Sequence, residues 1–156
     1  MKIDWLTPEH HIAMIEMLGD VYRYYNSGAD VDAETIEAHL QDNLLRPNAP
    51  FRLLVATKGH EIRGFAAVGI LHSFTDPLPG KNAQCQLKEL FVHADHRGEK
   101  IGEKLMQRVI EIARAEGCGR IDWHVKADNH AGIRFYQRFG AQYVEDRRSL
   151  RLDLNP

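Results

Sequence analysis

The spacing of apolar residues in the first fifty positions predicts a short strand followed by two helices. Residues 3–6 are typical of a strand. Apolar side chains then recur at spacings of three and four up to about Tyr25, which predicts a first helix. Aspartate often caps helices, and the residue before a proline disfavours helical dihedrals. A second helix is therefore expected between Asp32 and Pro47.

From residue 51 the period changes, and the pattern predicts an antiparallel meander of three strands. Residues 51–57 and 62–71 are mostly apolar and are joined by the turn KGHE, which indicates a hairpin of two buried strands. Residues 72–82 contain prolines and a glycine and are expected to form a loop. Residues 84–93 then supply the third strand.

The C-terminal half alternates helices with strands. We expect a helix over residues 101–116, a strand over 120–125, a helix over about 129–139 and strands over 141–154. A strand–helix–strand connection after a meander requires a crossover. The pattern therefore predicts one α+β domain over residues 1–156, with a central mixed sheet and helices on both faces.

Composition and charge narrow the class of protein. The 156 residues, 44% of them apolar, suffice for a buried core. Lys and Arg number 20 against 22 for Asp and Glu, which gives no support to a nucleic-acid partner. No segment has the apolar length of a membrane span or of a signal peptide. The two cysteines make no disulfide framework, so a cytoplasmic location is expected. His93 and His96 suggest no third ligand, so no metal is expected.

The stretch HADHRGEKIGEKL, residues 93–105, joins the third strand to a helix through a short basic turn. The first N–H groups of a helix lack partners within the helix and carry the positive end of its dipole, so this junction suits a phosphate. Gly98 and Gly102 let the backbone approach an anion, and Arg97 and Lys100 add positive charge. Neither common glycine-rich nucleotide pattern is present. On this segment alone, a glycine-bearing turn with solvated cations is the alternative.

Two blocks of the C-terminal half resemble the GCN5-related N-acetyltransferase (GNAT) family. They are LKELFVHADHRGEKIGEKLMQRVIEIA and IDWHVKADNHAGIRFYQRFGAQYVED, and the resemblance covers about residues 84–146. The family pattern N-x-x-A/G-x-x-F-Y-x-x-x-G-A is matched by Asn129, Phe135, Tyr136, Gly140 and Ala141. Family members often have glycine where Lys100 stands, and this departure is compatible with the pattern if Lys100 has ordinary helical dihedrals.

The resemblance implies a GNAT-like fold and an N-acetyltransferase with acetyl-CoA as acyl donor. It also implies that the diphosphate of the coenzyme binds the turn over residues 97–102, while the pantetheine arm pairs like an extra strand with the third meander strand. The expected coenzyme-binding residues are Leu90, Phe91, Val92, Arg97, Gly98, Glu99, Lys100, Ile101, Gly102 and Asn129. A homodimer is the common state of the family and is expected here.

Two residues are candidates for the acyl transfer itself. Glu89 lies beside the predicted thioester position and is the candidate base, because an amine must attack as the neutral form. A solvent-facing carboxylate, or one that only binds an ammonium group, is the alternative for Glu89. By the family's pattern, Tyr136 stabilises or protonates the departing thiolate. Its helical spacing with Ile133 and Phe139 also fits a core aromatic residue.

Two stretches and one pair of residues bear on the identity of the acceptor. HSFTDPLPGK and FYQRFGA are similar to the spermidine/spermine-type branch of the family, which usually has a Glu–Asp pair where this chain has Lys88 and Glu89. A polycation would meet a positive charge at Lys88, whereas an amino acid or a thialysine-like zwitterion could pair its carboxylate there. Asp76, Tyr24 and Tyr25 are further candidate substrate contacts.

The leading hypothesis is therefore an acetyl-CoA-dependent N-acetyltransferase that acts on a primary amine of a small molecule by direct attack on the thioester. The acceptor would be an amino acid, a diamine or a polyamine-like compound. Acetylation of a protein N-terminus or lysine side chain is one alternative. A non-catalytic module that binds coenzyme A is the other.

Overall fold

The computed structural model describes residues 1–155. Internal contacts divide the chain into two compact units, Met1–Trp123 and the segment that begins at His124. The expectation of one domain stays a prediction. Within residues 1–155, no helix combines the length and the apolar character needed to cross a membrane.

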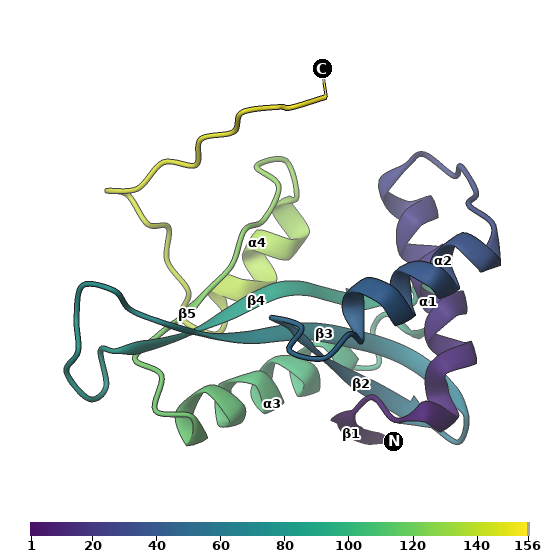
Figure 1. The fold of residues 1–156 in the computed structure, drawn as a ribbon, viewed down its shortest axis with the longest axis horizontal. Coiled ribbons are helices and arrows are strands. Elements are labelled where there is room, and N and C mark those ends of the chain that lie inside the picture. Colours follow the sequence, from purple (N-terminus) through teal and green to yellow (C-terminus); the bar gives the residue numbers. More distant parts are fainter. Residues whose placement is uncertain (156) are drawn as a thin grey trace. The chain divides into compact units, whose positions relative to one another are not determined.

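A five-stranded mixed sheet forms the centre of the first unit (Figure 1). Neighbouring strands follow chain order, with antiparallel pairing among the first four and parallel pairing between the last two. The strands are β1 (Lys2–Trp5), β2 (Arg52–Lys58), β3 (Glu61–His72), β4 (Ala83–Val92) and β5 (Ile121–Asp122). The meander forms as predicted, whereas the strand expected over residues 120–125 is confined to two residues.

Two helices, α1 (His11–Tyr25) and α2 (Ala33–His39), cover one face of this sheet (Figure 1). The N–H of Thr35 donates to Asp32 Oδ1 at 2.7 Å, so Asp32 caps α2 as predicted. The core on this face is made of Met14, Met17, Leu40, Leu53, Val55, Ile62, Phe65, Ala67 and Phe91. Short helical turns lie at Pro8–His10, Leu40–Leu44 and Ala94–His96.

The helix α3 (Ile101–Ala115) packs on the opposite face, as predicted from its apolar stripe. Its buried side chains are Ile101, Leu105, Met106, Val109 and Ala113. Gly64 of β3 allows the close approach, because a Cβ atom there would lie 3.2 Å from Ile101 and 3.3 Å from Leu105. The first turn of α3 is therefore held directly on β3.

The second unit contains the helix α4 (His130–Gln137), close to the range predicted for it. The strands predicted over residues 141–154 do not form, and this prediction is wrong. Leu150, Leu152 and Leu154 alternate as strand residues do, but they are 97%, 84% and 82% exposed. Alternation alone does not make a strand, because the backbone also needs a neighbouring edge with which to pair. In the described chain, no sheet takes up this segment.

Candidate active site

A β-bulge in β4 determines which side chains face α1. Glu89 pairs with Ala67 of β3, and Leu87 pairs with the next residue, Val68, so Lys88 has no partner on β3. Side chains alternate along a regular strand, and one extra residue reverses that alternation. Glu89 consequently shares the α1 face with Ala67, while Leu87 lies on the α3 face with Val68. Lys88 itself is exposed.

Glu89 meets the end of α1 on this face. The hydroxyl of Tyr25 donates to Glu89 Oε1 at 3.1 Å. The ring of Tyr24 lies 5.1 Å from that of Tyr25 and 5.6 Å from that of Phe91, so the tyrosine that contacts Glu89 belongs to an aromatic cluster. Burial raises the pKa of Glu89 above its usual value, and the hydrogen bond from Tyr25 opposes that rise in part. Three predicted site residues, Glu89, Tyr24 and Tyr25, are thus brought together.

The edge of β4 that faces β5 is open over most of its length. The parallel ladder contains only the pairs Cys85 with Ile121 and Gln86 with Asp122. Beyond Gln86, no strand of the first unit pairs with this edge of β4. Within the first unit, the backbone of the segment 90–92 therefore has no strand partner on the side where β5 ends, although the carbonyl of Val92 accepts the Nε of Arg97 at 3.2 Å. Such an edge can take up an extended arm that carries amides of its own.

The same strand leads into the basic turn before α3. The first backbone bond of the helix is donated by the N–H of Lys104 to the carbonyl of Lys100 at 3.1 Å. The N–H groups that precede Lys104 in the helix therefore have no acceptor within it. Gly98 has a φ of 89°, and a Cβ atom there would have nothing within 4 Å. The turn is open to the outside where an anion would approach the helix dipole.

Lys100 does not have the helical dihedrals that its place in the pattern calls for. It is the N-cap of α3 with φ 60° and ψ 22°, in the left-handed region, and its side chain makes no capping hydrogen bond. The condition of ordinary helical dihedrals, under which lysine at this position is compatible with the family pattern, is therefore not met. Glycine reaches this region without the steric cost that a Cβ atom brings. The turn therefore retains the conformation that suits glycine even though the residue is lysine.

Replacement of Lys100 by glycine is expected to raise the free energy of unfolding by up to about 1 kcal/mol. Relief of the left-handed strain favours the folded state, and the greater freedom of glycine in the unfolded chain offsets part of the gain. Urea denaturation measures the change. Lys100→Ala is the matched control, because alanine removes the charge but keeps the Cβ atom. Equal stability of the two variants would contradict the role assigned to the backbone.

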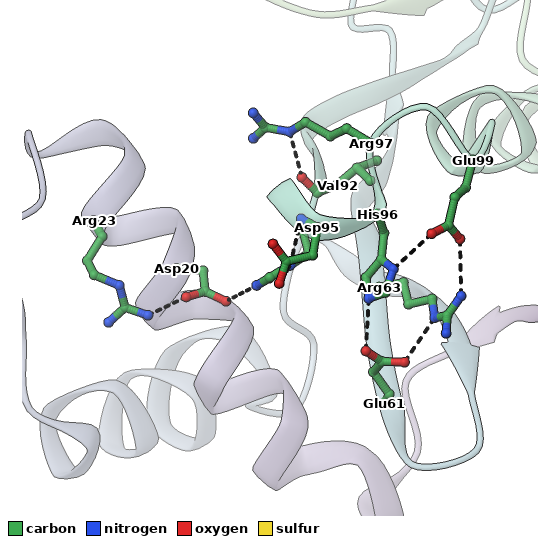
Figure 2. Close-up of polar contacts among 10 residues, drawn as sticks. Asp20, Arg23, Glu61, Arg63, Val92, Asp95, His96, Arg97 and Glu99 are labelled. Atoms are coloured by element: carbon green, nitrogen blue, oxygen red, sulfur yellow. Dashed lines mark hydrogen bonds and ion pairs between the residues drawn. The ribbon is translucent and has the colours of Figure 1, made fainter.

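Arg97 points away from α3, toward the end of α1 (Figure 2). Its Nε donates to the carbonyl of Val92 at 3.2 Å, and its guanidinium lies 5.3 Å from the ring centre of Tyr24 and 5.7 Å from that of Phe91. A cleft of about 300 Å³ opens beside these three side chains. The side chain of Glu99 is held on the other side of the turn, where it pairs with Arg63 at 3.1 Å.

In the second unit, Asn129 caps α4. Its Oδ1 accepts the N–H of Gly132 at 3.0 Å, as the sequence predicts for this residue. A Cβ atom at Gly132 would lie 2.5 Å from Nδ2 of Asn129, so a larger residue there would require the Asn129 side chain to shift. Tyr136 lies on α4, with its ring 5.1 Å from that of Phe135.

A family model described as the acetyltransferase (GNAT) family matches residues 12–141. The match takes in strands β2 to β5, the bulge, the basic turn and α4. The chain belongs to the GNAT family. The resemblance found in the two sequence blocks is therefore confirmed.

Individual relatives support this membership at modest identity. The Bacillus subtilis spermine/spermidine N(1)-acetyltransferase is 30% identical over 84 residues, which cover 53% of this chain and 54% of the relative. The mouse thialysine N-epsilon-acetyltransferase is 26% identical over 142 residues, covering 80% of this chain and 78% of the relative. The chain thus spans about half the length of the bacterial relative that it matches.

A solved structure from the Vibrio cholerae mobile metagenome, an integron cassette protein, has the same fold. It superposes with a TM-score of 0.88 at 24% identity, over 99% of this chain and 93% of that chain. The predicted fold class, an α+β fold with a mixed sheet and helices on both faces, is confirmed. At 24% identity this likeness shows the fold alone.

Not every predicted contact of this GNAT protein is brought together. Asp76 lies in the loop beyond β3, where its Oδ1 accepts the N–H of Leu78 at 3.1 Å. The loop starts after His72, five residues along β3 from Ala67, which pairs with Glu89. The loop thus begins roughly 17 Å of strand from the position of Glu89, and the hydrogen bond of Asp76 lies within the loop itself. The structure instead brings Glu61 and Arg63 of β3 to the basic turn, and no spacing in the sequence signals this contact.

Proposed function

We propose that this chain is an acetyl-CoA-dependent N-acetyltransferase that acts on a primary amine of a small molecule. One observation carries the proposal. The open edge of β4 leads directly into a helix N-terminus without capping side chains, and the half-buried carboxylate of Glu89 lies on the same strand. This arrangement offers one surface for an extended amide-bearing arm, one for its diphosphate, and a base beside them.

The described residues fit the coenzyme without rearrangement of the sheet. The backbone at 90–92 would pair with the pantetheine arm, and the amides of the turn 97–102 would hold the diphosphate. Asn129 would contribute a further contact, as the family's pattern implies. The bound coenzyme supplies the thioester as the acyl donor. The chain's own residues orient that group, take a proton from the amine and stabilise the departing sulfur.

The proton on the acceptor sets the main chemical requirement. A lysine-like amine has an ordinary pKa near 10.4, so roughly one molecule in a thousand is neutral at pH 7. Glu89 is the candidate that removes this proton, directly or through water. Its pKa is raised by burial, which makes the ionised carboxylate a stronger base than an exposed glutamate. Tyr25 orients it through the hydrogen bond of 3.1 Å.

The acceptor class follows from the charges around Glu89. Relatives are named for spermine, spermidine and thialysine, all of which carry primary amines. Lys88 is exposed at the bulge next to Glu89 and would repel the second charge of a polycation. A zwitterion such as an amino acid would present its carboxylate to Lys88 and its amine to Glu89. We therefore favour amino-acid-like acceptors over polyamines.

The decisive experiment follows thiol release from acetyl-CoA with a panel of acceptors. The panel contains lysine, thialysine, putrescine, spermidine and a lysine-bearing peptide. Turnover with the free amino acids alone supports the proposal, and turnover with the peptide alone supports a protein acetyltransferase. Binding of acetyl-CoA without turnover on any amine would support a non-catalytic module. Lys88→Glu is the matched variant, and it is expected to shift preference from thialysine toward spermidine.

Substitution of Glu89 by glutamine is expected to lower kcat/KM by about 100-fold without loss of stability. Because the folded-state pKa of Glu89 is raised, the ionised carboxylate destabilises the fold as pH rises through that pKa. Glutamine removes this penalty and still accepts the Tyr25 hydrogen bond. For the native enzyme, activity should fall as pH decreases through the raised pKa, since a base must be ionised.

Rate profiles against pH and urea denaturation at neutral pH measure the two effects. Glu37→Gln, on the exposed side of α2, is the control for loss of a carboxylate. A Glu89→Gln enzyme with native turnover would remove Glu89 from the mechanism. It would leave the carboxylate as a binding group for the acceptor.

A further inference from the structure

Four charged side chains form a closed ring behind the basic turn (Figure 2). Glu61 and Arg63 come from the start of β3, and His96 and Glu99 come from the turn itself. Glu61 contacts His96 Nε2 at 2.8 Å and Arg63 Nε at 2.9 Å. Glu99 contacts His96 Nδ1 and Arg63 Nη1, each at 3.1 Å. Each carboxylate thus bridges the imidazole and the guanidinium, with one oxygen for each.

The geometry of the ring requires a doubly protonated imidazole. Both nitrogens of His96 face carboxylate oxygens, which only accept hydrogen bonds. A neutral imidazole carries one N–H and would leave one of these contacts without a proton. The guanidinium of Arg63 and the imidazole of His93 also face His96, and the ring centre of His93 lies 5.8 Å from that of His96. The hydrogen bonds from Glu99 and Glu61 raise the pKa of His96 above its usual value, in agreement with the geometry.

The ring holds Glu99, which lies in the part of the turn with left-handed backbone geometry. Glu99 stands between Gly98, with φ 89°, and Lys100, with φ 60°. One left-handed residue stands on each side of it, and its carboxylate ties this part of the turn to Arg63 of β3. The main chain adds a second tie, since the N–H of His93 donates to the carbonyl of Arg63 at 2.9 Å. Glu99 is also the only acid between Arg97 and Gly102.

We propose that His96 is a positioning residue for coenzyme binding, which as an imidazolium holds Glu99 against β3 and keeps its negative charge away from the diphosphate. The proposal rests on the proposed function, because it assumes that the turn 97–102 binds the coenzyme. When His96 loses its proton, one hydrogen bond of the ring is lost and the ring changes from neutral to a net charge of −1. Both changes oppose an anion on the neighbouring amides.

The direction of the pH dependence follows from the raised pKa. The favourable arrangement is complete at pH values below the ordinary histidine value of about 6.5 and is lost as pH rises through the folded-state pKa of His96. Coenzyme affinity should therefore decrease toward alkaline pH. Linkage requires the reciprocal effect, so bound coenzyme should raise the pKa of His96 further.

Calorimetric titration with dephospho-CoA between about pH 6 and pH 9 tests the proposal. This probe retains the diphosphate and lacks the 3′-phosphate, whose own ionisation would obscure the result. The native protein is expected to bind about fivefold more weakly at the upper pH. His96→Gln is expected to bind with the weaker affinity throughout and to lose the pH dependence. Glu61→Gln keeps His96 but removes a carboxylate, so its midpoint should move to lower pH.

Control variants and a direct titration separate the possible results. His39→Gln, at the exposed end of α2, should keep the native profile. The imidazole resonances of His96, followed by NMR in the free protein, should titrate above the ordinary value and move upward with bound dephospho-CoA. A His96→Gln protein with the native pH profile, or a native affinity that does not change with pH, would overturn the inference. No binding of dephospho-CoA at any pH would overturn the proposed function as well.

Discussion

Substitution of Gly102 by glutamate should weaken acetyl-CoA binding by about 100-fold. Gly102 is the second residue of α3, among the N–H groups that precede the first backbone bond of the helix. A carboxylate there occupies the positive end of the helix and repels the diphosphate. Two like charges about 4 Å apart near a protein surface repel by about 4 kcal/mol, and screening reduces this to about 3 kcal/mol.

The fold should tolerate this change, and that makes the result interpretable. Glutamate in the first turn of a helix interacts favourably with the helix dipole, so the melting temperature of Gly102→Glu is expected to equal or exceed the native value. Gly102→Gln is the matched control, since glutamine has the same shape without the charge. Calorimetry should find a loss for Gly102→Glu several times greater than for Gly102→Gln. Equal losses would indicate steric exclusion, and normal affinity in both would place the diphosphate elsewhere.

The parts of the fold that were predictable have long or regular patterns. The apolar stripe of α3 repeats over fifteen residues, and the meander consists of apolar runs separated by clear turn residues. Hydrophobic periodicity indicates which face of a helix or strand is buried, so long regular patterns identify these elements. The start of α2 was also predictable, because Asp32 caps it through a bond to a residue only three positions away.

Single-residue features of the site were not predictable from a periodic pattern. The bulge at Lys88 depends on one unpaired residue, which changes the face of every side chain beyond it while leaving the composition of the strand unchanged. The left-handed backbone of Lys100 contradicts the preference of lysine. It persists because the strand end, the ring around His96 and the first turn of α3 act on the same few residues. Local propensity contains none of these constraints.

Contacts distant in sequence were the other omission. His96 and Glu61 are separated by 35 positions, and only the antiparallel pairing of β3 with β4 brings them together. The opposite error occurred over residues 141–154, where alternation suggested strands but no edge is paired in the described chain. The homodimer and the cytoplasmic location inferred from the sequence stay predictions. The periodicity of a segment does not show which distant residue or strand edge it will contact, and these predictions depended on that contact.

Tyr136→Phe should reduce kcat by about 100-fold while leaving the affinity for acetyl-CoA within about twofold of the native value. Phenylalanine keeps the ring and its contact with Phe135, so α4 loses only a hydroxyl. Full proton transfer from a phenol to a thiolate is uphill by about 2 kcal/mol, given ordinary pKa values near 10 and 8.5. In the proposed mechanism the hydroxyl would therefore act as a hydrogen-bond donor as charge develops on sulfur, with solvent completing the transfer.

This mode of action predicts a separation of kinetic parameters that a packing role does not. An interaction made only as the sulfur departs lowers kcat and kcat/KM equally and leaves the dissociation constant of the coenzyme unchanged. If Tyr136 served only as a core aromatic residue, phenylalanine would preserve turnover. Tyr143→Phe is the matched control, since it removes a hydroxyl from a side chain that is 61% exposed. Native kcat in Tyr136→Phe would exclude the hydroxyl from the reaction, and thiolate stabilisation would then fall to backbone amides along β4.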